Sequence, residues 1–372
     1  MYMKFWYPVV RSEDLGKTPQ KVRILAHDFV VFRDEQGKSA VLSDTCIHRG
    51  ASLAAGKCKE DGTVQCPYHG WRFNAQGQCT RIPSIGSKTK PPSRARVDSY
   101  PVQEKYGIVF AFLGDLPESE RPPIMEVEEH GTPEWRHTVI TFDINYNYER
   151  SIENGLDPAH NEYVHPTHGH QGTREDSYTM MELRPFKNTD WGYGFMASFD
   201  APPLKNPIMR RARPGGGKME AGSGSHGPNQ IWTYINFSEK YSMHQYMFEA
   251  PIDESHTKIY LLSLRNWLLE DVHDARMAAV TMTVVKEDMA VVENLNPVRT
   301  PDTNTKEVLV PGDTAIAAYR EWLKKWDAKG WKIDVRALNA RLGDFAVNIP
   351  CPARRTSDNW VQETVPLVPG NA

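Results

Sequence analysis

Two short loops in the first quarter of the chain each carry one cysteine and one histidine. The segment TCIHRG contains Cys46 and His48, and CPYHGW contains Cys66 and His69, with seventeen residues between His48 and Cys66. Two thiols and two imidazoles in this pattern are typical of a metal site, so the two loops have to meet in space. The flanking segments FVVFRDEQGKSAVL and RFNAQGQC alternate strand-forming residues with polar, glycine-containing turns. We therefore expect a small β domain that presents two ligand loops.

The order of these residues distinguishes between two kinds of metal site. Two cysteines and two histidines can hold a tetrahedral zinc ion. Here each loop gives one sulfur and one imidazole, which is the arrangement of a Rieske [2Fe-2S] cluster, where two cysteines hold one iron and two histidines hold the other. The pattern therefore predicts such a cluster, a carrier of single electrons, on Cys46, His48, Cys66 and His69.

The other cysteines and the overall charge exclude several classes of protein. Five cysteines are an odd number, which argues against a closed disulfide framework, and Cys58, Cys79 and Cys351 are expected to be unreactive thiols. The formal net charge of −3, without a long basic run, does not favour a nucleic-acid partner. No apolar run approaches the roughly 18 residues of a membrane span, and the first residues do not resemble a secretory signal. We expect a cytoplasmic protein without a membrane partner.

The length of 372 residues suits two domains. We expect the cluster in residues 1–118 and a second, catalytic domain in residues 119–372. An electron carrier alone does not need about 250 further residues. The second domain should therefore use the electrons.

A second group of metal-binding residue types lies in the segment ENGLDPAHNEYVH. Asn154, Asp157 and His160 follow at steps of three, which keeps them near one helix face. His165 is five residues after His160, which on a regular helix turns it about 140° away. A pair of iron-binding histidines therefore requires a distorted or interrupted helix between them. By itself the segment also fits a polar loop with unrelated histidines.

Two further histidines follow the pair, in HPTHGH. His168 and His170 are rival imidazoles, but their place after a proline favours a polar loop behind the ligand segment.

A carboxylate has to complete an iron site of the two-histidine type, in which Fe(II) keeps positions open for O₂. The segment VVKEDMAVVENLNP offers Glu287, Asp288 and Glu293 in a region that is predicted to be helical from about residue 271. Periodicity selects none of the three. A solvated helix face is the alternative interpretation.

These motifs in this order resemble the Rieske non-haem iron oxygenases, specifically their terminal oxygenase (α) subunits, over residues 5 to about 330. The resemblance implies that His160, His165 and Asp288 bind a mononuclear Fe(II). It also implies that Asp157 connects the cluster of one subunit with the iron of its neighbour in a homotrimer. Asn154 is expected in the outer shell of the iron site, with a purely structural hydrogen bond as the alternative.

Six segments between residues 135 and 267 are rich in β-branched and aromatic residues and are predicted to be strands. They are residues 137–149, 177–186, 193–199, 231–237, 243–252 and 258–267. Helices are expected near residues 271–294 and 313–327. We expect an α+β fold, and the resemblance implies a helix-grip (START-like) antiparallel sheet with helices. Residues 201–230 are dense in glycine and proline and are expected to form a long loop near the pocket mouth.

The expected function is that of a terminal oxygenase for a small aromatic or otherwise hydrophobic molecule. A ferredoxin or flavin reductase would supply the electrons and O₂ would be the co-substrate. The compact chain resembles homotrimeric monooxygenases and O- or N-demethylases; a cis-dihydroxylating aromatic-ring dioxygenase is the first alternative. A Rieske electron-transfer or ligand-binding protein without a working iron is the second. The tail segment IPCPARRTSDNW is expected to pack against a neighbouring subunit.

Overall fold

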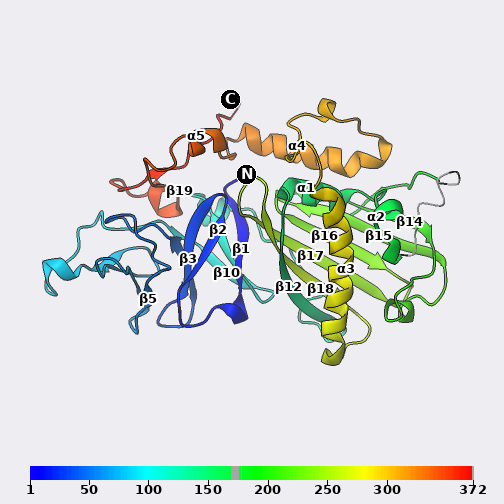
Figure 1. Cartoon of the computed structure of the whole chain (residues 1–372), viewed down its shortest axis with the longest axis horizontal. Coiled ribbons are helices and arrows are strands. Elements are labelled where there is room, and N and C mark those ends of the chain that lie inside the picture. The colour runs from blue at the N-terminus through cyan, green and yellow to red at the C-terminus, as the bar shows by residue number, and fades with distance from the viewer. Residues whose placement is uncertain (169–175, 177, 371–372) are drawn as a thin grey trace. The chain divides into compact units, whose positions relative to one another are not determined.

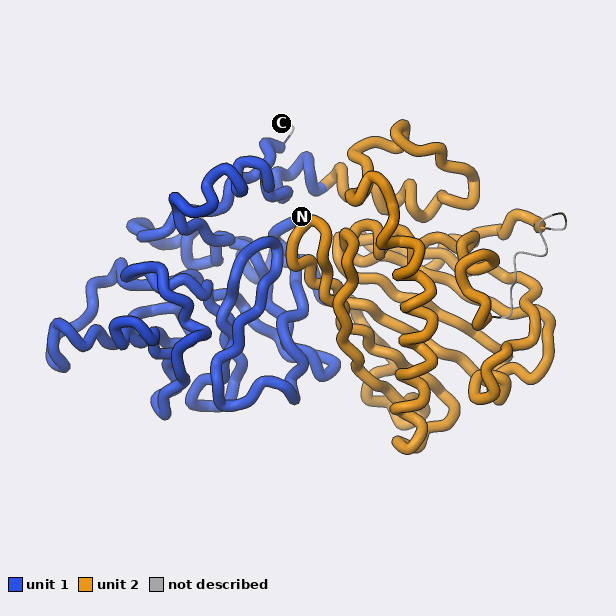
Figure 2. Tube along the Cα trace, viewed as in Figure 1, with its two compact units in different colours: residues 1–124, 326–372 blue, residues 125–325 orange. Residues whose placement is uncertain are grey.

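The computed structural model describes residues 1–168, 176 and 178–370, and these form two compact units (Figures 1 and 2). The first unit consists of residues 1–124 and 326–372, and the second of residues 125–325. Among the described residues, no helix combines the length and the apolar character needed to cross a membrane.

The first unit contains three small antiparallel sheets and, near its C-terminal end, one parallel pair of short strands. β1, β11 and β10 form one sheet and β2, β3, β4 and β9 form the second. β5, β6, β7 and β8 form the third, whose strands are only two or three residues long. The strands of this unit are β1 (Phe5–Arg11), β2 (Gln20–Ile24), β3 (His27–Arg33), β4 (Ser39–Ser43), β5 (Lys57–Cys58), β6 (Val64–Gln65), β7 (Arg72–Phe73), β8 (Cys79–Arg81), β9 (Ser99–Tyr100), β10 (Val102–Lys105) and β11 (Ile108–Leu113).

The C-terminal residues belong to the first unit, which differs from the expected division at residue 118. This tail includes α5 (Val335–Asn339), β19 (Val347–Asn348) and β20 (Glu363–Thr364). Trp326 packs edge-on against Phe5, with ring centroids 4.9 Å apart. The guanidinium of Arg354 makes two hydrogen bonds of 2.6 and 2.7 Å to the buried carboxylate of Asp98. Aromatic packing and a buried ion pair thus hold residues that the sequence assigned to the catalytic domain. Packing of the tail on a neighbouring subunit stays a prediction.

The second unit contains one seven-stranded antiparallel sheet, in the order β12-β18-β17-β16-β15-β14-β13 (Figure 1). Successive side chains along each strand point to opposite faces of the sheet. The strands are β12 (Arg136–Ile144), β13 (Arg184–Pro185), β14 (Gly194–Ala201), β15 (Gly217–His226), β16 (Gln230–Asn236), β17 (Ser242–Pro251) and β18 (Thr257–Arg265). The expected α+β class and antiparallel sheet are confirmed. The strand predicted over residues 177–186 is wrong for most of its described part, where only Arg184–Pro185 pair.

A third of the predicted loop at residues 201–230 is in fact a strand, β15. Its glycines allow close packing inside the sheet. A Cβ on Gly224 would lie 2.5 Å from the ring of Trp232, and one on Gly222 would lie 2.0 Å from the carbonyl oxygen of Phe195. The glycine content that indicated a loop therefore serves to admit an indole and a neighbouring backbone.

Helices cover one face of this sheet. These are α1 (Tyr148–Leu156), the single turn α2 (Asn161–Val164) and α3 (Asp274–Val292); the remaining long helix, α4 (Thr314–Ala328), follows later in the chain. Figure 1 shows α3 lying across the strands. Met289 and Val292 of α3 pack on Ile259 and Leu261 of β18. The predicted helices at 271–294 and 313–327 are present, and α3 carries the carboxylates in question to the helix-covered face.

Candidate metal centre

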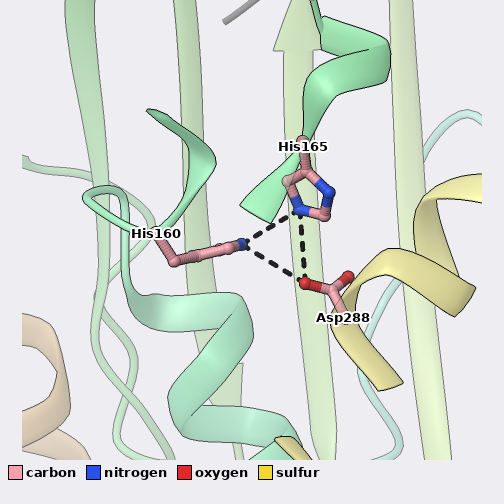
Figure 3. Close-up of side chains that lie close together, drawn as sticks. All are labelled: His160, His165 and Asp288. Carbon is pink, nitrogen blue, oxygen red and sulfur yellow. Dashed lines mark hydrogen bonds and ion pairs between the residues drawn. The ribbon is translucent and has the colours of Figure 1, made fainter. Parts of the chain in front are cut away.

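Three side chains from α3 and the ends of α2 converge on one point (Figure 3). Nε2 of His160 lies 3.2 Å from Nε2 of His165. Oδ1 of Asp288 lies 3.5 Å from Nε2 of His160 and 3.2 Å from Nε2 of His165. Among the described residues, these three bring one ligand atom each within 4.8 Å of one another, as a site for a single metal ion requires.

A break in the helix brings the two histidines together. α1 ends at Leu156, because Asp157 precedes Pro158 and adopts an extended conformation with φ −95° and ψ 111°. His160 then stands before the first residue of α2, and His165 follows its last residue with non-helical angles. The predicted distortion therefore lies at His165, where the helical turn ends ahead of Pro166, and the two rings point toward each other instead of apart (Figure 3).

Both rings are fixed by hydrogen bonds of their other nitrogen. Nδ1 of His160 lies 2.6 Å from the backbone carbonyl oxygen of Asp157. Nδ1 of His165 lies 3.0 Å from Oε2 of Glu287. A carbonyl and a carboxylate only accept, so each Nδ1 carries the proton and each Nε2 keeps its lone pair.

A second layer holds the carboxylates of α3. The side-chain amide of Asn154 donates to Oδ1 of Asp288 over 3.1 Å. The hydroxyl of Thr167 donates to Oε2 of Glu287 over 2.8 Å, so this carboxylate orients His165 and does not face the centre. Glu293 accepts hydrogen bonds from the backbone and side chain of Asn145. Of the three carboxylates that periodicity could not separate, only Asp288 faces the centre.

Burial and neighbouring charges shift the pKa values at this centre in opposite directions. Burial lowers the pKa of His160. Burial also opposes protonation of His165, but the carboxylates of Asp288 and Glu287 outweigh it and raise its pKa. Burial acts to raise the pKa of Asp288, while the two histidines and Asn154 outweigh it and lower that pKa. The net field at the centre thus favours a cation.

The donor set fits a divalent metal ion. Two imidazole lone pairs and a carboxylate oxygen meet at one point, where they repel one another unless a cation lies between them. Bonds of about 2.1 Å at near right angles separate neighbouring donor atoms by about 3 Å, which is close to the observed spacings. Two histidines and one carboxylate on one side of a metal are the ligands of non-haem Fe(II) oxygenases.

Asp157 lacks one contact that a connecting residue would use. A carboxylate that connects two metal centres would accept a hydrogen bond from a ligand histidine on either side. Instead the carboxylate of Asp157 accepts from the backbone N–H of Ala159 over 2.7 Å, and its other oxygen is 3.9 Å from Nδ1 of His160. The backbone carbonyl replaces it because the break at Pro158 turns that carbonyl toward the ring. The carboxylate keeps 28% of its surface exposed and is open to a further partner.

The rival histidines have different positions. The ring of His168 lies against that of His165, with centroids 4.6 Å apart and planes tilted by 49°, and His168 is not among the three converging residues. His170 lies outside the described residues.

The two cysteine-histidine loops of the first unit have matching backbone geometry. The N–H of Cys46 donates to the carbonyl of Ala51, and the N–H of Cys66 donates to that of Trp71. In each loop a glycine four residues after the cysteine, Gly50 or Gly70, has φ +72° and donates to the cysteine carbonyl. The same tight turn, which needs a left-handed residue, therefore presents each ligand pair.

The four predicted cluster ligands come together at these loops. Cys46 and Cys66 are buried and their thiols are in contact, and burial together with Cys66 raises the pKa of the Cys46 thiol to about 12. The rings of His48 and His69 are exposed, with centroids 4.4 Å apart. Two thiols inside and two imidazoles at the surface fit a cluster that carries one iron on each pair. Trp71 stacks on His48, with an interplanar angle of 9°.

Sequence reasoning missed a buried ionic network beside the metal centre. Glu153 of α1 accepts from Arg320 over 2.6 Å and from Arg150 over 3.0 Å. Both arginines also reach the carboxylate of Glu307. The network ties α1 to α4, and the only signal in the sequence was Glu153 at the start of the histidine segment.

Comparison with known families gives one match for each half of the chain. Residues 5–101 match the family of the Rieske [2Fe-2S] domain. Residues 144–329, half of the chain, match the C-terminal domain of the vanillate O-demethylase oxygenase.

Individual relatives agree with these matches. The α subunit of phenoxybenzoate dioxygenase from Ectopseudomonas oleovorans is 35% identical over 44% of this chain and 43% of its own length. The oxygenase subunit of 5,5'-dehydrodivanillate O-demethylase from Sphingobium is 28% identical over 56% of this chain and 50% of its own. The chain thus spans half or less of these curated relatives.

Solved structures share the fold over most of the chain. Pseudomonas putida NdmA with caffeine has a TM-score of 0.73 at 23% identity, covering 88% of this chain and 91% of the other. Dicamba monooxygenase bound to dicamba has a TM-score of 0.72 at 21% identity, covering 88% and 98%.

Proposed function

Because this chain belongs to the Rieske non-haem iron oxygenases, we propose that it is a terminal oxygenase that hydroxylates or demethylates an aromatic or hydrophobic small molecule. The observation that carries the proposal is the presence in one chain of both ligand sets. An electron carrier needs the cysteine-histidine loops alone. The convergence of His160, His165 and Asp288 gives the electrons a use.

In this proposal Cys46, His48, Cys66 and His69 hold the [2Fe-2S] cluster, and the converging triad holds Fe(II). When bound, the cluster supplies single electrons and the iron activates O₂.

The protein's own groups set the geometry of the iron site. Glu287 and the carbonyl of Asp157 keep Nδ1 of the two histidines protonated, so that both Nε2 atoms face inward. Asn154 holds Asp288 in place by its 3.1 Å hydrogen bond. Such outer partners commonly control metal affinity and activity by 10- to 100-fold, an order-of-magnitude expectation. His165 is the most buried of the three ligands, and its burial keeps water away from this side chain.

We further propose a homotrimer in which Asp157 connects the cluster of one subunit with the iron of the next. The rings of His48 and His69 are exposed, so the histidine side of the cluster loops is accessible to a neighbouring subunit. Two aromatic residues beside the two centres, Tyr68 and Tyr163, are 61% and 62% exposed and are available to a neighbouring subunit. The partly exposed carboxylate of Asp157 is available to an imidazole of another subunit.

A ferredoxin or flavin reductase is the proposed electron donor. Beside the cluster, residues 81–94 contain four exposed cationic side chains and no acidic one; they are Arg81, Lys88, Lys90 and Arg94. This surface complements an acidic carrier, whose approach would be accelerated at low ionic strength. The five cysteines form no disulfide among themselves in the described structure, and a reduced carrier is an intracellular reagent, so we place the enzyme in the cytoplasm.

Demethylation or hydroxylation is favoured over cis-dihydroxylation by the C-terminal match to vanillate O-demethylase. The name of the phenoxybenzoate relative keeps the dioxygenase as the second candidate. Purified enzyme with a surrogate reductase can be screened with vanillate, caffeine and dicamba. Formaldehyde in proportion to O₂ consumed supports demethylation, and a dihydrodiol without formaldehyde supports the alternative. Metal analysis separates both from an electron carrier, because an oxygenase holds about three irons per chain and a carrier about two.

A further inference from the structure

A carboxyl group without a partner is buried under α1, on the helix-covered face of the sheet. Glu249 of β17 is 0% exposed, and neither of its carboxyl oxygens has a well-formed hydrogen bond within the described part of the chain. Met247, two residues earlier on the same strand, lies near Gly155 of α1. Residues two apart on a strand share a face, so Glu249 also faces α1. The mechanism described above makes no use of this acid.

Two hydroxyl groups, those of Ser151 and Tyr146, lie near Glu249. The hydroxyl of Ser151, on α1, faces both the carboxyl of Glu249 and the hydroxyl of Tyr146, and it acts to lower the pKa of each. Tyr146 is 5% exposed, and the negative charges of Glu249 and Asp288 both add to the effect of burial in raising its pKa. Tyr146 is therefore within electrostatic range of both the acid and the iron ligand.

The surroundings keep Glu249 protonated. Burial raises its pKa to about 8, and no cation within the described residues offsets this. The titratable groups that face the Glu249–Tyr146 pair are Asp288 and Glu293 of α3, and both are acidic. From α1 the facing group is the neutral Ser151, and β18 contributes the apolar Ile259 opposite Glu249. A buried acid that holds its proton near neutral pH is suited to donate it when negative charge develops nearby.

We propose that Glu249 stores a proton for the reduction of O₂ at the centre formed by His160, His165 and Asp288, and releases it through Ser151 and Tyr146. This inference rests on the proposed function and adds a proton-donating residue to it. The overall reaction is R–H + O₂ + 2e⁻ + 2H⁺ → R–OH + H₂O. The substrate C–H and the O–O bonds break, C–O and O–H bonds form, the electrons come from the reduced carrier, and Glu249 supplies one of the two protons.

On the route from Glu249, each hydroxyl oxygen that accepts a proton also gives one up. Ser151 accepts the proton of Glu249 and donates its own to Tyr146, and Tyr146 donates its own toward the centre. Glu249 is left as a carboxylate, which regains a proton from solvent before the next turnover.

The test uses the iron-loaded holoenzyme and three variants. Glu249→Gln removes the acid and keeps its shape, and Ser151→Ala interrupts the route and keeps the acid. Glu239→Gln, at an exposed turn of the same sheet, is the matched control. Infrared difference spectroscopy follows the protonated carboxyl as pH is raised. The fraction of consumed O₂ that appears as product, and the fraction released as peroxide, are measured with whichever compound gives product in the screen above.

The wild type and Ser151→Ala should show a protonated carboxyl that titrates near pH 8, and Glu249→Gln should lack it. In both Glu249→Gln and Ser151→Ala the ratio of product to O₂ should fall about tenfold, with peroxide released instead and metal content unchanged. Glu239→Gln should match the wild type. If the wild type and Glu249→Gln give the same ratio of product to consumed O₂, the proton route is overturned and the proposed function is not. A wild type that forms no product from O₂ overturns the proposed function, and the proton route with it.

Discussion

Nε2 of His160 and Nε2 of His165 face each other across 3.2 Å although five residues separate them. A continuous helix would turn the second ring about 140° from the first. The turn of α2 ends at Val164 and His165 takes non-helical backbone angles, which removes this conflict. Considered alone, the five-residue spacing argues against a metal site. A one-turn helix with a histidine at each end requires this spacing.

Replacing the carboxylate of the triad should remove the mononuclear iron alone. In Asp288→Ala, two imidazoles remain, and they are too few to hold Fe(II) in a facial site. Iron content should fall from about three to about two per chain, while the visible absorption of the [2Fe-2S] cluster persists. Retention of about three irons together with turnover would show that another residue is the third ligand.

Glu287 should act through His165 without binding the metal. Glu287→Gln keeps the shape but turns a purely accepting group into one that can also donate to Nδ1, which weakens control of the imidazole tautomer. We expect the affinity for iron to fall by about tenfold, with turnover restored at high iron concentration. The control is Glu293→Gln on the same helix, whose carboxylate bonds to Asn145 away from the centre. Similar iron affinity in the two variants would assign Glu287 a structural role only.

The motifs with fixed covalent spacing were predicted from the sequence, whereas the choice among neighbouring carboxylates was not. Cys46, His48, Cys66 and His69 converge as their spacing predicts. Glu287 and Asp288 are adjacent on one helix, and periodicity cannot distinguish them because both lie near the boundary between buried and exposed faces. Only the direction of His165, whose two nitrogens reach one carboxylate each, separates their roles.

Long-range packing explains the remaining differences. The tail from Trp326 joins the first unit through contacts with Phe5 and Asp98, more than 200 residues away in sequence. β15 was missed because its glycines are required by the neighbouring ring of Trp232, a contact across strands that local composition does not encode. Local propensity is a weak predictor wherever such partners are distant.

Asp157→Asn should separate metal binding from electron transfer. The contacts that fix the iron site use the backbone carbonyl of this residue, so both metal centres should remain loaded. The neutral amide should slow the transfer of electrons between subunits by about tenfold or more, since it cannot serve as an anionic acceptor to an imidazole of a neighbour. Single-turnover experiments on the pre-reduced enzyme measure this step. An unchanged rate of product formation in that assay would remove Asp157 from the electron route.

The stability of the second unit should depend on the ionisation of Glu129. This carboxylate lies 2.6 Å from Nδ1 of His244 and accepts from the hydroxyl of Tyr246 over 2.7 Å. Burial acts to raise its pKa, but these two partners outweigh it and lower the pKa to about 2. A lowered folded pKa means that the stabilisation is present above about pH 4.5 and is lost as the pH falls toward 2. Glu129→Gln should therefore lower the free energy of unfolding by about 2 kcal/mol at neutral pH, and the difference from the wild type should shrink as acid is added. Urea unfolding across this pH range measures the effect. The control is Glu128→Gln, at an exposed neighbouring position. If the difference in unfolding free energy stays constant down to the lowest pH, packing of the Glu129 side chain and not its charge is responsible.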